Sequence, residues 1–138
     1  MTIGSDQLDA WGRPGRLLIT GSRHWSDSET MLRALKSAFN EMLSQGYREI
    51  TLVHGDATGA DRMAEDLWRQ TGMPVERHPA NWRAHGRLAG PVRNRAMVAA
   101  GADLCLAFPL GESKGTRGCM REAARAGIPT RVIEKEST

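Results

Sequence analysis

The sequence predicts an α/β fold in which one mainly parallel sheet of five strands is covered by helices on both faces. Short apolar runs alternate along the chain with segments of helical periodicity, and glycine or proline separates most of these segments. The chain has 138 residues, which suits a single domain, and 40% of them are hydrophobic, which is enough for one core. We therefore expect a single three-layer sandwich with strand order 3-2-1-4-5.

The first strand and the first helix show the two periodicities most clearly. The run from Leu17 to Thr20 stops at Gly21 and is typical of a strand buried on both faces of a parallel sheet. Apolar residues then recur at helical spacing between residues 31 and 43. This spacing predicts a helix that begins near a capping box at Ser26 and ends at Gly46.

The remaining elements follow the same alternation. Each expected helix ends near a glycine, and Pro91 suits the first position of a helix because its missing N–H would have no helical acceptor there. The expected strands lie at 50–53, 75–78, 104–108 and 130–133, and the expected helices at 60–71, 91–100 and 116–126.

The two ends of the chain are expected to lie outside this domain. Residues 1–15 are rich in glycine and are predicted to form a flexible arm, residues 16–133 the domain, and residues 134–138 a tail. No apolar run approaches the ~20 residues of a membrane span, and the start of the chain lacks the apolar stretch of a signal peptide. The sequence therefore predicts a cytoplasmic protein with no membrane partner.

Basic residues are concentrated in one segment of a chain whose net charge is +3. No carboxylate occurs between Glu76 and Asp103, and such a field attracts anions. The alternative is that several of these arginines only coat the surface. The basic residues of the segment are Arg77, His78, Arg83, His85, Arg87, Arg93 and Arg95.

The loop after the first strand has the composition of a phosphate-binding turn. In open parallel sheets, ligands bind beyond the carboxyl ends of the strands. Gly21 permits a tight turn, the Ser22 hydroxyl can donate, and Arg23 can form a two-pronged contact with phosphate. A turn followed by a solvated arginine is the alternative.

The loop after the second strand, residues 54–61, carries two glycines before a helix start, where backbone amides can face an anion. It lacks the lysine of a P-loop and the Gly-x-Gly-x-x-Gly spacing of dinucleotide folds. Asp56 is a candidate to bind ribose hydroxyls or a metal, or to act as a base. Asp61 is interpreted as an acid that complements the helix dipole. The candidate binding residues of this loop are His54, Gly55, Asp56, Thr58, Gly59 and Ala60.

Two further helix starts complete the predicted site. Arg93 and Asn94 are expected in the first turn of the helix at 91–100, where free amides and a guanidinium can bind phosphate together. Gly115 and Thr116 begin another helix, with Thr116 as its N-cap or as a ligand contact. If Arg93 serves phosphate, its replacement should weaken binding and leave stability nearly unchanged.

Four motifs follow one another along the chain: GSR at 21–23, HGDATGAD at 54–61, GPVRNRAM at 90–97 and FPLGESKGT at 108–116. In this order they resemble the SLOG superfamily of Rossmann-like proteins, in particular its small YspA-related members. The resemblance covers residues 16–133 and implies a nucleotide or nucleotide-derived ligand bound by the loops after strands one, two and four.

The chain departs from the related LOG phosphoribohydrolases, which release a base from a nucleoside monophosphate. Arg93 resembles their catalytic arginine, but Gly118 stands where their catalytic glutamate is expected. Hydrolysis would therefore need Asp56 or Glu122 beside Arg93 as catalytic residues.

Three functions remain open after the sequence analysis. The first is a hydrolase that cleaves an N-glycosidic or phosphate linkage of a nucleotide. The second is a nucleotide sensor without chemistry, and the third is single-stranded nucleic-acid binding by the segment 77–95, although no known DNA-binding motif is present. The four histidines have no metal-ligand spacing, and we expect no metal and no cofactor. Trp25 and Trp82 flank the proposed loops and could stack on a base. Assembly into a homo-oligomer is also left open.

Overall fold

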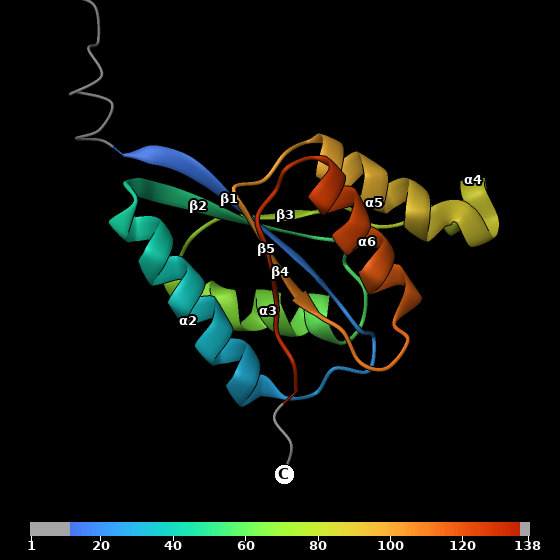
Figure 1. Ribbon diagram of the computed structural model, residues 1–138, viewed down its shortest axis with the longest axis horizontal. Coiled ribbons are helices and arrows are strands. Elements are labelled where there is room, and N and C mark those ends of the chain that lie inside the picture. Colours follow the sequence, from blue (N-terminus) through green and yellow to red (C-terminus); the bar gives the residue numbers. More distant parts are fainter. Residues whose placement is uncertain (1–11, 136–138) are drawn as a thin grey trace, which may run out of the picture.

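The computed structural model describes residues 12–135 and contains one sheet of five strands. All neighbouring strands are parallel, and their order is β3-β2-β1-β4-β5. The predicted fold class and strand order are therefore confirmed (Figure 1). In chain order the elements are β1 (Arg13–Gly21), α2 (Ser28–Ser44), β2 (Tyr47–His54), α3 (Ala60–Trp68), η1 (Arg69–Thr71), β3 (Val75–Arg77), α4 (Trp82–His85), η2 (Gly86–Leu88), α5 (Ala89–Ala99), β4 (Leu104–Phe108), α6 (Lys114–Arg125) and β5 (Thr130–Val132).

Helices α2 and α3 cover one face of the sheet, and α5 and α6 cover the other (Figure 1). The central strand β1 alternates between the two faces, so Leu17 and Ile19 join the core under α2 and α3. Leu18 instead packs with Met97 and Cys119 under α5 and α6. This double burial explains why the strand reads as an uninterrupted apolar run.

Strand β1 begins at Arg13, so residues 13–15 belong to the sheet and not to the expected arm. The Arg13 amide donates to the Gly46 carbonyl at 3.1 Å, and its guanidinium lies 4.6 Å from the centre of the Tyr47 ring. Pro14 lies beside an irregularity in the pairing with β2, which is a position that tolerates proline. Residues 1–11 and 136–138 lie outside the described residues.

Three helix starts differ from those expected. Asp27, not Ser26, caps α2 and accepts a hydrogen bond from the Thr30 amide at 3.0 Å. Helix α5 begins at Ala89. Pro91 is tolerated at its third position because that position still lies in the first turn, where no N–H is needed. The expectation that Arg93 lies in the first turn is therefore wrong, and its backbone amide is not a free donor at a helix start.

Helix α6 begins at Lys114, two residues before the expected start. Its N-cap is Ser113, whose φ of 43° places it in the left-handed region. Thr116 is consequently the third residue of the helix and not its N-cap.

The short helix α4 and the turn η2 were not expected from the sequence. They lie before the start of α5 and project away from the sheet (Figure 1). Asn81 caps α4 by accepting a hydrogen bond from the Ala84 amide at 3.0 Å. Among residues 12–135, no helix has the length and apolarity needed to cross a membrane.

Candidate functional site

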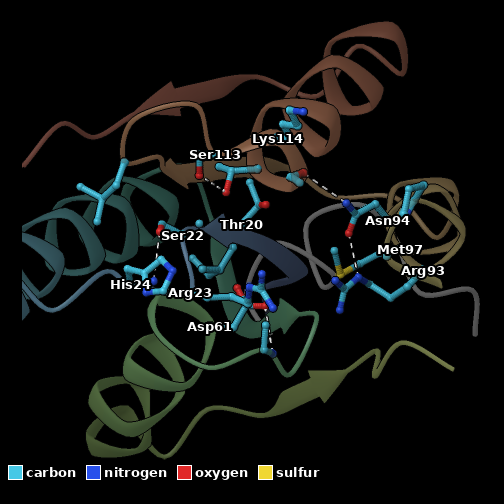
Figure 2. A pocket seen from close by; sticks show the side chains of 18 of the residues that line it. Thr20, Ser22, Arg23, His24, Asp61, Arg93, Asn94, Met97, Ser113 and Lys114 are labelled. Carbon is cyan, nitrogen blue, oxygen red and sulfur yellow. Dashed lines mark hydrogen bonds between the residues drawn. The ribbon is translucent and has the colours of Figure 1, made fainter. Parts of the chain in front are cut away.

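A cavity of about 410 Å³ lies at the carboxyl end of the sheet, within the size range of small-ligand sites. Its walls come from the end of β1, the loop after β2, the segment around α4 and the starts of α5 and α6 (Figure 2). The lining residues are Ile19 to His24, Ala57, Asp61, Trp82, Arg87, Gly90, Pro91, Arg93, Asn94, Met97, Leu110 and Ser113 to Thr116.

The charged side chains that line the cavity are mostly cationic. Arg23, Arg87 and Lys114 are exposed, and none of them has a protein partner among the described residues. Arg93 adds a fourth cation, and Asp61 is the one carboxylate among the lining residues. A cavity with this balance attracts an anionic ligand.

Arg93 holds neighbouring loops together. Its Nη1 donates to the carbonyls of Gly55 and, at 3.4 Å, of His78, while its Nε donates to the Asn94 amide oxygen at 2.7 Å. A Cβ at Gly55 would lie 2.2 Å from Nη1, so glycine is needed there for the arginine to approach. Only Nη2 has no protein partner among residues 12–135. The expectation that Arg93 can be replaced without loss of stability is therefore not supported.

Asp61 is a lining residue whose importance the sequence analysis missed. It is 6% exposed, and its Oδ2 accepts hydrogen bonds from the amides of Gly55 and Ala57 at 3.1 and 3.3 Å. Its Oδ1 is buried and has no hydrogen-bond partner. Burial raises the pKa of Asp61 to about 6, and His54, the two amides and Arg93 only partly offset this effect.

A signal for the burial of Asp61 was present in the sequence. Ala60, Ala64 and Trp68 lie on one face of α3, and all three are buried. Asp61 lies next to this face, three and seven residues before Ala64 and Trp68. A carboxylate in this position is unusual for an acid that serves only the helix dipole.

His54 lies under the loop and not in the cavity wall. It is 0% exposed, its Nδ1 accepts a hydrogen bond from the Asp56 amide at 2.9 Å, and its Nε2 lies 2.8 Å from a Glu65 oxygen. Because Nδ1 accepts, the proton is on Nε2 and is donated to Glu65. Arg77 holds the same carboxylate by two hydrogen bonds of 2.6 and 2.7 Å, and these bonds are the main reason that the pKa of Glu65 lies well below its usual value. His54 thus anchors the loop.

The rest of this loop packs against the loop after β1. Gly59 has a φ of 80°, and a Cβ there would lie 2.4 Å from the Arg23 carbonyl. The Ala60 amide at the start of α3 donates to the Ser22 carbonyl at 3.1 Å, so it is not free for a ligand. Thr58 is exposed outside the cavity lining. The glycines therefore permit contact between two loops of the protein.

The two acids proposed for catalysis also lie outside the cavity lining. Asp56 has a φ of 55° and faces Arg62, with 3.9 Å between Oδ1 and Nε. Glu122 on α6 pairs with Arg125 at 3.1 Å. Neither carboxylate lines the cavity, and the lining carboxylate is instead Asp61, whose charge interacts with that of Arg93.

The first and fourth loops do contribute to the cavity. Ser22 accepts a hydrogen bond from the His24 amide on its Oγ at 3.0 Å, and its own amide donates to the Phe108 carbonyl at 2.9 Å. Asn94 donates from Nδ2 to the Gly115 carbonyl at 3.3 Å and thereby links α5 to the start of α6 (Figure 2). The predicted site residues that line the cavity are Gly21, Ser22, Arg23, Arg93, Asn94, Gly115 and Thr116.

The two tryptophans proposed for stacking differ in position. Trp82 lines the cavity and is 60% exposed. Trp25 is buried and lies edge-on to Phe108, with ring centres 5.2 Å apart. Among residues 12–135, no three side chains of His, Cys, Asp or Glu are grouped so that they could hold a metal ion.

Two comparisons place the chain among known proteins. A family model described as the YspA, cpYpsA-related SLOG family matches residues 15–85, slightly more than half of the chain. The Gene 61 protein of Mycobacterium phage D29 is 52% identical over 120 residues, which cover 83% of this chain and 92% of that protein. The resemblance seen in the sequence motifs is thus confirmed, and the chain belongs to the YspA, cpYpsA-related SLOG family.

Proposed function

We propose that this protein binds a nucleotide or nucleotide-derived ligand in the 410 Å³ cavity and holds it by a phosphate group. The observation that carries the proposal is the set of cations without protein partners, Arg23, Arg87 and Lys114, around one cavity. Arginine offers a two-pronged contact to phosphate, and lysine offers a compact charge. Membership of the family supports a nucleotide-related ligand.

The start of α6 supports phosphate binding at the same cavity. The first amides of a helix have no helical acceptor, and residues 114–116 at this start all line the cavity. Lys114 is the first residue of this helix and contributes a cationic side chain to the cavity lining. The exposed ring of Trp82 offers a surface on which a base can stack.

Calorimetric titration with adenosine 5′-monophosphate, ADP-ribose and inorganic phosphate tests the proposal. Arg23→Ala and Lys114→Ala should each weaken nucleotide binding about tenfold, roughly 1.4 kcal/mol. The matched control is Arg121→Ala, which removes an exposed arginine of α6 outside the cavity lining and should leave affinity unchanged. Absence of binding to every nucleotide, or an equal loss in the control, would contradict the proposal.

Hydrolysis of the bound nucleotide is a second candidate function, and it is favoured by the carboxylate of Asp61 in the cavity wall. Chromatography of the same mixtures after long incubation is the test. Release of free base or phosphate by the wild type, and its loss in Asp61→Asn, would support hydrolysis. Intact ligand would instead support binding without chemistry, as in a sensor.

The structure gives less support to nucleic-acid binding by the segment 77–95. Arg77 is held by Glu65, and Arg93 by backbone carbonyls, so two of its arginines are already engaged within the protein. A steep loss of single-strand binding between low and physiological salt would favour that alternative.

A further inference from the structure

One carboxylate oxygen of Asp61 is, among the described residues, the buried side-chain polar atom that lacks a hydrogen-bond partner. The side chain is 6% exposed, its Oδ2 is held by two backbone amides, and its Oδ1 has no partner. Buried polar atoms of folded proteins are nearly always hydrogen-bonded, and an exception calls for an explanation by function. Because Asp61 lines the cavity, a ligand can provide the missing partner.

The chemistry of a carboxylate restricts what that partner can be. An ionised carboxylate only accepts hydrogen bonds, so Oδ1 needs a donor. A phosphate group has only acceptor oxygens when ionised and would be repelled by the negative charge of Asp61. The part of a nucleotide that meets Asp61 is therefore a neutral donor, and the hydroxyl groups of the sugar are donors that every ribonucleotide carries.

The positions of the charged groups agree with this division. Lys114 and Asp61 lie on opposite sides of the pocket, at the start of α6 and at the start of α3 (Figure 2). A phosphate held by Lys114 and the amides of α6 would direct the attached sugar into the cavity, toward the loop after β2. The raised pKa of Asp61 agrees with a carboxylate that lacks a donor in the ligand-free state.

We infer that Asp61 accepts a hydrogen bond from the 2′- or 3′-hydroxyl of the ligand's sugar, so that the site binds a ribonucleotide more tightly than the analogue that lacks this hydroxyl. This inference rests on the proposed function and adds the class of sugar. A site built to bind a hydroxyl rejects the analogue that lacks it, because the buried acceptor is then left unpaired.

The test compares the binding of adenosine 5′-monophosphate with that of its 2′-deoxy and 3′-deoxy analogues by calorimetry. The wild type should bind at least one deoxy analogue ten or more times more weakly. In Asp61→Asn the amides of Gly55 and Ala57 need an acceptor, so the asparagine oxygen faces them and its NH₂ group faces the cavity. The variant exchanges an acceptor for a donor at nearly constant shape and should lose the preference.

Asp66→Asn is the matched control, since Asp66 is an exposed acid on the same helix outside the cavity lining and its replacement should leave the preference intact. Equal binding of adenosine 5′-monophosphate and both of its deoxy analogues by the wild type would overturn the inference while leaving nucleotide binding established. A preference that persists in Asp61→Asn would also overturn it. Purine riboside 5′-monophosphate lacks the amino group of the adenine base. If Asp61→Asn weakens the binding of adenosine 5′-monophosphate but not of this analogue, Asp61 contacts the base and the inference is also overturned. Failure of all nucleotides to bind would instead refute the proposed function itself.

Discussion

Replacing Asp61 by asparagine should make the ligand-free protein more stable at pH 8, although the residue is buried. The pKa of Asp61 is raised from 3.8 to about 6 by burial, which means that the folded protein holds this proton more tightly than the unfolded chain does. Ionisation of Asp61 therefore costs stability as the pH rises from about 3.8 to about 6. Above pH 6 the cost is complete and constant. A pKa difference of this size corresponds to about 3 kcal/mol.

The pH dependence distinguishes this effect from a general change in packing. Asparagine keeps the acceptor for the amides of Gly55 and Ala57 and cannot ionise. From linkage, Asp61→Asn should gain about 3 kcal/mol at pH 8 and about 1.5 kcal/mol at pH 5. The gain should fall to about 0.4 kcal/mol at pH 3.8 and disappear at lower pH.

Urea denaturation followed by tryptophan fluorescence measures both values, since Trp25 and Trp68 are buried in the core. A variant that is less stable than the wild type at pH 8 would refute the reasoning. So would a gain of the same size at pH 8 and pH 5, because ionisation would then not be its cause. If the same variant also loses ribose preference, Asp61 is a residue that serves binding at the expense of stability.

The other predictions concern the loops that frame the cavity. Arg93→Ala should lower the free energy of unfolding by about 1–3 kcal/mol, because the carbonyls of the loops that it joins lose a charged donor, and should also weaken nucleotide binding; denaturation and calorimetry measure the two effects. Gly59→Ala should destabilise the fold more than Gly55→Ala in thermal unfolding. The first places a Cβ against rigid backbone at a positive φ, whereas the second meets only the guanidinium of Arg93, which can move. Glu65→Gln should cost about 2 kcal/mol at pH 7. Since the pKa of Glu65 is lowered in the folded state, its contribution is present above pH 4.5 and is lost as the pH falls below that value, so the difference between variant and wild type should shrink in acid denaturation series.

The strands and helices could be predicted because their signals are local. Leu17, Leu18 and Ile19 are all fully buried, and a short apolar run of this kind that ends at a glycine is typical of a strand covered on both faces. The early start of β1 at Arg13 could not be read locally, since its pairing depends on Tyr47 and Gly46, more than thirty residues away. The same holds for the start of α5, where Pro91 is compatible with more than one position of the first turn.

The site was less predictable, because residue type did not decide which acid would face the cavity. Asp56 lies in the loop after β2 and Asp61 at the start of α3, and a carboxylate is common both in such loops and at helix starts. Asp61 is buried in the first turn of α3 and lines the cavity, whereas Asp56 lies outside the lining. Gly59, between the two acids, allows close contact with the backbone of Ser22 and Arg23. That contact joins two loops that are distant in the sequence, so the sequence of either loop alone does not predict it.

The glycine-rich loop after β2 also has a different role from the one its composition suggests. Its amides at Gly55 and Ala57 do bind an anion, but the anion is the carboxylate of Asp61 from the same chain. The start of α3 is therefore already neutralised, and a phosphate there would meet both a negative charge and occupied donors. The start of α6, with Lys114 and no acidic residue in its first turn, has no such internal anion. We therefore expect the phosphate of a nucleotide at α6 and its sugar at Asp61, an orientation that follows from where the protein has placed its own negative charge.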